Sequence, residues 1–309
     1  MRIWLALSVI LLWSGPGAPA QPAPERPSDN LLTRPALQAV VEAQVDRDSE
    51  TLRTKLDTDA AEVRARAAFA LASVQDTTAI PGLLSLLKES VPRVQTDAAF
   101  ALGQMPPGSV PESPLLRTLS FERDAQVQRR LIEALGKTGD AASLRSLLRL
   151  RPPPGRNPTL ALSIARYGMR GITDSIATNW LAKHLRANDP WTRRNAAYAL
   201  GRVEALAASR ADTIRAVLDD VASDDPAAMH LLRALSTAGD STDATRVAEW
   251  LRSAPDWRTR VEAARALASL PTAEGPRSAL VGALDDDHLL VARTAAETLA
   301  GLDWSPDRT

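Results

Sequence analysis

The chain has 309 residues, with 37 basic and 37 acidic side chains, no cysteine and only 4% aromatic residues. The absence of cysteine excludes a disulfide framework, a thiolate nucleophile and a cysteine-based zinc or iron–sulfur site. A net charge of zero argues against a general nucleic-acid binder, which needs excess basic charge to displace counterions from phosphates. Apolar residues at 45% and charged residues at 24% are typical of a folded globular chain.

Residues 1–20 have the pattern of a secretory signal peptide. Arg2 gives a positive start, Ile3–Trp13 is uncharged and almost entirely apolar, and Ala18–Ala20 places small residues around a cleavage position. The apolar run is shorter than the roughly 20 residues that a membrane-spanning helix needs. We therefore expect cleavage after Ala20 and a periplasmic or secreted protein. Retention as an uncleaved membrane anchor is the alternative.

The segment after the predicted cleavage position is rich in proline, and residues 21–34 predict an extended tether. Pro35–Val45 and Ser49–Leu56 then predict a divergent N-terminal helical pair within residues 35–58. No later segment is apolar enough to cross a bilayer, so we expect no membrane insertion once the signal is cleaved.

A repeat of about 32 residues organises the rest of the chain. Each copy contains small or apolar residues at i, i+4, i+7 and i+8, which lie on one face of an α-helix. The last position of each stripe is an anchor, and successive anchors are 31 to 35 residues apart. The anchors are Leu71, Leu102, Leu135, Tyr167, Leu200, Leu235, Leu267 and Leu299. Alanine dominates the stripe, which favours close approach of neighbouring helices.

Each copy also carries start and stop signals for its first helix. Aspartate or proline precedes the stripe, as expected at N-cap and N1 positions, at Asp59, Pro92, Asp124, Asp189, Asp225, Asp256 and Asp286. Glycine follows the anchor in four copies and predicts helix termination, at Gly103, Gly136, Gly168 and Gly201. A second apolar helix follows in most copies, and no segment sustains strand alternation. The sequence therefore predicts an all-α solenoid of about eight helical-hairpin repeats.

The array has one internal break and an incomplete end. Residues 59–150 hold repeats 1–3, and residues 159–309 hold repeats 4–8. The Pro-rich segment 151–158 is interpreted as a surface loop, with a hinge between two halves as the alternative. The last repeat lacks a second helix, whereas solenoid ends normally need a polar cap. This end would pair with another molecule, be closed by Trp304, or mark a chain cut short of a further domain.

The best copies of the repeat are Asp59–Ala72 and Asp189–Gly201, which follow the pattern D-x-x-V-R-x-x-A-A-x-A-L-G. This pattern resembles the HEAT-like repeat family, in particular the short bacterial form found in phycobilin-lyase-type proteins, and it covers residues 59–302. The resemblance implies a helical solenoid. It leaves the function open, because such arrays host unrelated roles.

The sequence offers no catalytic or metal-binding constellation. His184, His230 and His288 are far apart, and none belongs to a His-Glu pair. HEAT-like metalloenzymes of the deoxyhypusine hydroxylase type carry such pairs repeatedly. Aspartate clusters such as Asp285–Asp287 fall between predicted helices, where capping explains them. We therefore predict no enzyme, no cofactor and no bound metal, with His184 and His288 as solvated helix-end residues.

Arginine recurs seven residues before the anchor as Arg64, Arg193 and Arg260. These side chains either form a partner-binding stripe or pair with a capping aspartate of the adjacent repeat, and we favour the pairing. A separate candidate surface lies on the second helices, because tryptophan and arginine are enriched in binding hot spots. Its residues are Arg145, Arg149, Arg215, Trp250 and Arg252. In HEAT-like solenoids this helix layer usually lines the concave face.

These features predict an exported, non-enzymatic scaffold that presents an extended surface to a protein or peptide and does not bind nucleic acid. The alternative is a recognition segment of a larger or split enzyme, such as a HEAT-repeat-linked cyclophilin-type prolyl isomerase, whose catalytic domain is absent from these residues. A bilin-lyase-like activity follows from the resemblance alone. The export signal and the lack of a candidate nucleophile argue against it.

Overall fold

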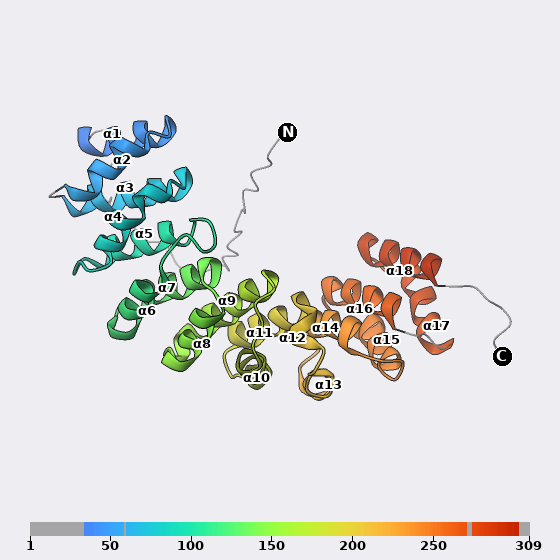
Figure 1. Cartoon of the computed structure of the whole chain (residues 1–309). Coiled ribbons are helices and arrows are strands. Elements are labelled where there is room, and N and C mark those ends of the chain that lie inside the picture. The colour runs from blue at the N-terminus through green and yellow to red at the C-terminus, as the bar shows by residue number, and fades with distance from the viewer. Residues whose placement is uncertain (1–33, 59, 271–273, 303–309) are drawn as a thin grey trace, which may run out of the picture.

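The computed structural model describes residues 34–58, 60–270 and 274–302, and every regular element in these ranges is a helix. The helices stack along a curved array that runs from α1 at one end to α18 at the other (Figure 1). The predicted all-α solenoid is therefore confirmed. The predicted signal peptide, the tether as far as residue 33, Asp59 and residues 303–309 with Trp304 lie outside the described residues.

The described part of the chain begins with α1 (Pro35–Val45), α2 (Ser49–Thr54) and a 3₁₀ helix (Lys55–Asp57). The first helices of the repeats are α3 (Ala61–Val74), α5 (Pro92–Leu102), α7 (Ala125–Thr138), α9 (Asn157–Met169), α11 (Pro190–Arg202), α14 (Ala228–Ala238), α16 (Trp257–Ser269) and α18 (Leu289–Gly301). The second helices are α4 (Ile80–Leu86), α6 (Glu112–Phe121), α8 (Ala141–Leu150), α10 (Ser175–His184), α13 (Ala211–Asp220), α15 (Asp243–Ser253) and α17 (Glu274–Gly282).

Four short elements complete the path. The helix α12 (Glu204–Ala207) lies between α11 and α13, and 3₁₀ helices occur at Thr77–Ala79, Pro154–Arg156 and Ala283–Asp285. The Pro-rich segment 151–158 therefore contains a 3₁₀ helix and the first residues of α9. Within the described parts of the chain, no helix has both the length and the apolar character that a membrane span requires.

The two helices of each repeat form two layers. The first helices line the inner, concave side of the arc, and the second helices line its outer, convex side (Figure 1). The expectation that the second helices line the concave face is therefore wrong. The alanine stripe explains the difference, because small side chains let each first helix contact the next one along the whole row from α3 to α18. The closely packed side of the array becomes the inner side of the curve.

The glycines that follow the anchors serve this close approach. Gly103 is the C-cap residue of α5, as predicted, whereas Gly136, Gly168 and Gly201 lie inside their helices, so their predicted role as helix terminators is wrong. A Cβ atom at Gly136 would lie 2.6 Å from the Ser163 side chain of the next first helix. At Gly201 it would lie 2.4 Å from the carbonyl oxygen of His230. Glycine is required here because the neighbouring backbone leaves no room for a side chain.

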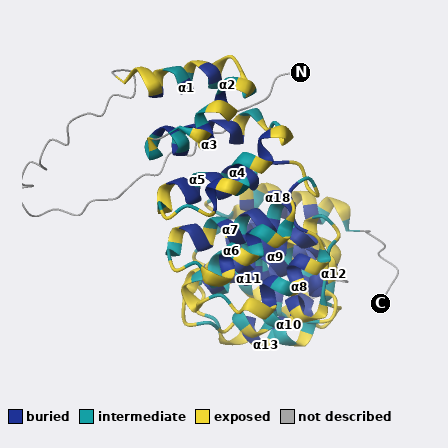
Figure 2. Cartoon of the chain, turned by 60° about the vertical axis from the view of Figure 1, so that its left-hand side comes forward, coloured by how far each residue is buried: buried dark blue, intermediate teal, exposed yellow. Residues whose placement is uncertain are grey.

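The core fills the space between the stacked helices, where buried residues gather, while exposed residues lie along loops and edges (Figure 2). Leu71, Leu102, Leu135, Leu200, Leu235 and Leu267 are anchors with no exposed surface. The fourth anchor, Tyr167, is also fully buried, and its hydroxyl forms a 2.8 Å hydrogen bond with Ser143 Oγ. Burial raises the pKa of Tyr167 to about 12, so the weakest copy of the repeat keeps a neutral phenol in its core.

The predicted aspartate caps are confirmed at several first helices. Asp124, Asp189 and Asp256 each accept a hydrogen bond from a backbone N–H of the first helical turn, and Pro190 occupies the first position of α11. Asp76 and Asp140 cap the second-helix segments of their repeats in the same way. Each cap satisfies a backbone donor that the helix itself leaves unpaired.

The arginine ladder predicted between repeats is also present. Arg193 pairs with Asp225 at 2.6 Å, Arg260 pairs with Asp286 at 2.7 Å, and Arg64 pairs with Glu89 in place of an aspartate at 2.7 Å. Each guanidinium also donates to a backbone carbonyl of the loop before its own helix. One planar side chain therefore joins the loops at the start of two successive first helices.

Candidate protein-interaction surfaces

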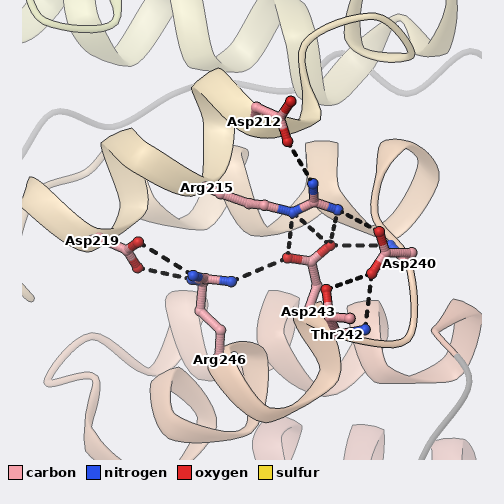
Figure 3. Close-up of polar contacts among 7 residues, drawn as sticks. All are labelled: Asp212, Arg215, Asp219, Asp240, Thr242, Asp243 and Arg246. Atoms are coloured by element: carbon pink, nitrogen blue, oxygen red, sulfur yellow. Dashed lines mark hydrogen bonds and ion pairs between the residues drawn. The ribbon is translucent and has the colours of Figure 1, made fainter.

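Arg215, predicted as a partner-binding residue, lies at the centre of an ion-pair network between α13 and α15 (Figure 3). Its guanidinium lies 2.7 Å from Asp243 and 2.8 Å from both Asp240 and Asp212. The side chain of Asp212 is almost fully exposed, whereas that of Asp243 has no exposed surface. The hydrogen bonds of Arg215 are therefore made within the fold, mainly to Asp240 and Asp243 of the next repeat.

The buried carboxylate of Asp243 remains charged in this network. Burial acts to raise its pKa, but hydrogen bonds from Arg215 and from the backbone N–H of Asp240 hold the pKa below its ordinary value. Arg246 adds a contact to Asp243 at 3.2 Å and reaches Asp219 of α13 at 2.8 Å. Two outer helices of neighbouring repeats are thus held together by four charged groups.

The other predicted residues divide between structural contacts and an open surface. Trp250 is half-buried against the core, and Arg252 donates to the carbonyl of Gly275 in the next repeat at 2.8 Å. Arg145 pairs at 2.9 Å with Asp174, the N-cap residue of α10. Arg149 is exposed. Arg145 and Arg149 come together at one groove, whereas Arg215, Trp250 and Arg252 do not belong to it.

This groove lies between α8 and α10 and has a volume of about 760 Å³. Its polar lining is basic, with Arg145, Arg149, Arg151 and Lys183 from the end of α8 and from α10. Asn157, Asn179 and His184 also line the groove, and the rest of the wall is formed by apolar side chains and by the prolines of the loop after α8. These apolar residues include Leu148, Leu160, Ile176 and Trp180.

The inner face carries a second surface, here called the inner aromatic row, made of Arg66, Phe69, Phe100, Arg130 and Lys137. The rings of Phe69 and Phe100 stack across α3 and α5 at 5.4 Å between centroids. Arg66 lies 5.6 Å from the Phe69 ring, and Arg130 and Lys137 lie 5.1 and 5.9 Å from the Phe100 ring. Phe69 remains 45% exposed, so the row presents apolar surface to solvent.

Polar groups beside the inner aromatic row are incompletely paired. One terminal nitrogen of Arg66 is buried and has no hydrogen-bond partner within the described residues, while the other donates to Gln44. Asp97, one helix further along, has its pKa raised by burial, and its ion-pair partner Arg93 lies 4.0 Å away. Arg66, Phe69 and Asp97 line one open depression of about 680 Å³.

Glu133 continues the row on α7. Lys137, Arg130 and Arg166 pair with its carboxylate at 3.1, 2.9 and 3.4 Å. Burial acts to raise the pKa of Glu133, but these cations, led by Lys137, hold it below its ordinary value. The Glu133 cluster extends the surface from α3 to α9.

Farther along the inner face, Tyr198 and His230 meet edge to face, 5.4 Å between ring centroids. Burial, helped by the nearby charges of Arg194 and Arg233, lowers the pKa of His230 to about 4. The imidazole is therefore neutral near pH 7. A neutral, half-buried histidine fits packing between α11 and α14 rather than acid–base chemistry.

His184 and His288 both lie at helix ends, as predicted, but neither is simply solvated. The His184 ring stacks on Trp180 at 3.7 Å, and the His288 ring stacks on Trp257 at 4.0 Å while capping α18. In residues 34–58, 60–270 and 274–302, no three histidine or acidic side chains gather as a metal site would require.

The inner aromatic row was missed by sequence reasoning, which followed the buried stripe and the position seven residues before the anchor. Four of its members, together with Asp97 and Glu133 beside them, occupy the positions five and two residues before the anchor. These are Arg66, Asp97 and Arg130, and Phe69, Phe100 and Glu133. Phenylalanine at the same exposed register in two successive copies was the available signal, because an aromatic residue is not needed outside the core.

Comparison with known proteins agrees with this architecture. Residues 49–120 match the family of HEAT repeats. The fold is similar to a crystal structure of an engineered protein, with 22% identity, coverage of 86% of this chain and 82% of that chain, and a TM-score of 0.52. A further match is the complex of CpcE and CpcF of phycocyanin lyase from Nostoc sp. PCC7120. It has 18% identity, covers 83% of this chain and 99% of that chain, and has a TM-score of 0.42. No curated protein matches the chain.

The paired helices and the two-layered arc define the class of the protein, an α-solenoid. The matched segment and the copies of the same signature along the rest of the array define it further, and the chain is a HEAT-like repeat protein. The family match covers residues 49–120. The later repeats are assigned from their own helical pairs and from the recurring arginine–aspartate contacts.

Proposed function

We propose that the chain is an exported, non-enzymatic scaffold that binds an extended segment of a protein partner along its inner face. The observation that carries this proposal is the stacked and partly exposed pair of Phe69 and Phe100, flanked by three cations. Exposed aromatic surface next to arginine is the typical composition of a binding hot spot. Solenoids present such residues on extended concave surfaces.

An extended polypeptide fits the polar groups beside the aromatic row. The carboxylate of Asp97, whose ion-pair partner Arg93 lies 4.0 Å away, is an acceptor for a peptide N–H. A partner that donates to this carboxylate compensates for its incomplete pairing. The apolar rings of Phe69 and Phe100 would then contact the side chains on one side of the bound segment.

Export and the absence of catalysis are parts of the same proposal. Support for export comes from the charged start, apolar run and small residues of 1–20. Mass spectrometry of the protein recovered from its own cells tests this, with a mature N-terminus at Gln21 as the expected result. Recovery of an intact N-terminus from the cytoplasmic fraction contradicts export. For catalysis, the intact mass of a captured partner should be unchanged after incubation with the protein.

Site-specific photo-crosslinking tests the binding surface. A photoreactive phenylalanine analogue is placed at position 69 on the inner face or at position 121 on the outer helix α6, where Phe121 is 82% exposed. We expect a discrete crosslinked species from position 69 that Arg130→Glu diminishes and that position 121 does not give. Equal crosslinking from both positions, or none from position 69, contradicts the inner face as the binding surface.

A further inference from the structure

The groove between α8 and α10 differs from every other charged region of the outer layer described above, because three of its four cations lack acidic partners. Arg145 pairs with Asp174, but within the described parts of the chain no ion pair or hydrogen bond engages the side chains of Arg149, Arg151 or Lys183. No carboxylate belongs to the groove lining. A chain with zero net charge thus concentrates uncompensated positive charge at one site.

Three arginines of the outer layer show the contrast. Arg215 and Arg246 are each held by two or three aspartates, and Arg186 pairs with Asp220 across the next gap between helices. These arginines complete the fold. The side chains of Arg149 and Lys183 are not needed for such contacts and remain available to a ligand.

The groove also has an apolar wall. Ile176 is 52% exposed although it lies on a helix, and the Trp180 ring lies beside it, stacked on His184. Leu148 and Leu160 also line the groove. An apolar patch bordered by cations complements a ligand that combines negative charge with a bulky apolar group.

The loop after α8 brings a third unpaired cation to the groove. Arg151 is the C-cap residue of α8 and has a φ of 47°, the left-handed conformation in which many helices end. This position places Arg151 at the groove, beside Pro152 and Pro154.

We propose that this groove is a second interaction site, separate from the inner face, which binds an acidic peptide segment that carries a bulky apolar side chain. Carboxylates of the peptide pair with Arg149, Arg151 and Lys183, and the apolar side chain packs against Ile176 and Trp180. Arginine suits this role because its fork binds a carboxylate through two parallel hydrogen bonds. The groove volume of about 760 Å³ accommodates a few side chains and is too small for a nucleic-acid duplex.

The proposal is tested with a defined probe and the purified full chain. The probe is a dye-labelled hexapeptide, Glu-Glu-Phe-Leu-Glu-Glu, with blocked ends, and its binding is followed by fluorescence anisotropy at about 50 mM salt. Saturable binding is expected, and the analogue with glutamine in place of each glutamate should not bind. Arg149→Glu and Lys183→Glu should each weaken binding about tenfold or more.

A matched control separates the groove from general charge. Arg117 is an exposed cation on the neighbouring outer helix α6, so Arg117→Glu changes the net charge by the same amount without touching the groove. Its affinity for the probe should stay within about twofold of the parent chain. Circular dichroism should show the parent helicity for all three variants, because none of the three side chains forms a hydrogen bond or ion pair within the described fold.

Three results overturn the proposal. The first is a lack of saturable binding by the glutamate probe. The second is equal weakening by Arg117→Glu and Arg149→Glu, which reduces the effect to net charge. The third is tighter binding of a single-stranded oligonucleotide or of phosphatidylserine vesicles, lost in the same groove variants, which assigns the site to another class of ligand.

Discussion

The inner and outer layers of the solenoid are joined from repeat to repeat in different ways. On the inner side, helices touch through backbone and small side chains, and Gly201 faces the carbonyl of His230 with no space for a Cβ. On the outer side, long side chains cross wider gaps, as Arg145 does to Asp174 and Arg215 to Asp243. Steric fit therefore sets the inner layer, whereas charge pairing holds the outer layer together.

This difference explains the curvature and the placement of function. The side with the small residues is the shorter side of the arc, and the side bridged by arginine is the longer one. The exposed register of the inner helices is free to carry Phe69 and Phe100, because the contacts between repeats use other positions. On the outer layer, a cation is free for a ligand only where its acidic partner is missing, as at Arg149.

The largest effect is expected where the outer layer buries charge. Asp243→Ala removes the only fully buried carboxylate of the network and leaves Arg215 and Arg246 without their shared partner. We expect a loss of about 3–5 kcal/mol in the free energy of unfolding, measured by urea titration with circular dichroism. Asp212→Ala removes an exposed partner of the same arginine and should have no measurable effect. Equal losses in both variants would contradict the role of burial.

The inner layer is tested by adding volume. Gly201→Val places a side chain against the carbonyl of His230, so neighbouring helices must separate, with an expected loss of about 2–3 kcal/mol. Gly275→Val is the matched control, because nothing lies within 4 Å of a Cβ at that position of α17. Urea unfolding should show the control within about 0.5 kcal/mol of the parent chain. A tolerated Gly201→Val would mean that the inner layer is not sterically set.

The fold was predictable from the sequence because the same helical pattern, which is weak evidence in one copy, recurs in eight copies. Eight anchors, from Leu71 to Leu299, repeat one helical stripe, and Asp124, Asp189 and Asp256 cap helices where the pattern placed them. The ladder between Arg193 and Asp225 also followed, because opposite charges recur one repeat apart. Local periodicity thus fixed both the helices and the contacts that depend on one repeat length.

The sequence could not show which layer is concave or where the glycines act. Gly136 after an anchor has the same sequence signature as a helix terminator, and only the distance to Ser163 reveals its packing role. Of the predicted partner-binding residues, Arg145 and Arg149 meet in one groove, whereas Arg215 is surrounded by aspartates. Whether an arginine is free depends on partners about 28 residues away, and helix period alone does not report them.

A pH titration separates the two layers further. His230 on the inner layer has a pKa of about 4 in the folded protein, against an ordinary value of about 6.5. The unfolded chain therefore binds more protons between these values, so stability falls as pH falls through this window. We expect a loss of about 2 kcal/mol between pH 7 and pH 4.5 that His230→Gln largely abolishes.

The control for this titration is His288→Gln, which keeps His230 and should retain the pH dependence. Asp243 on the outer layer responds at lower pH. Its pKa lies below the ordinary aspartate value, so its contribution to the free energy of unfolding persists until the pH falls below about 4. Urea unfolding at several pH values measures both effects. If the free energy of unfolding of His230→Gln fell with pH as steeply as that of the parent chain, the pH dependence would belong to other groups.

The smallest effect is expected at the exposed bridges of the outer layer. Arg186 and Asp220 form an ion pair across the gap between α10 and α13, but both side chains are more than half exposed. Water and salt screen such a pair, and holding two long side chains in place costs entropy, so Arg186→Ala should lose about 0.5 kcal/mol or less. The loss should vanish in 1 M salt, whereas the loss in Asp243→Ala should persist, because the buried carboxylate is shielded from ions. A large, salt-independent loss in Arg186→Ala would show that exposed bridges stabilise the outer layer as strongly as the buried network does.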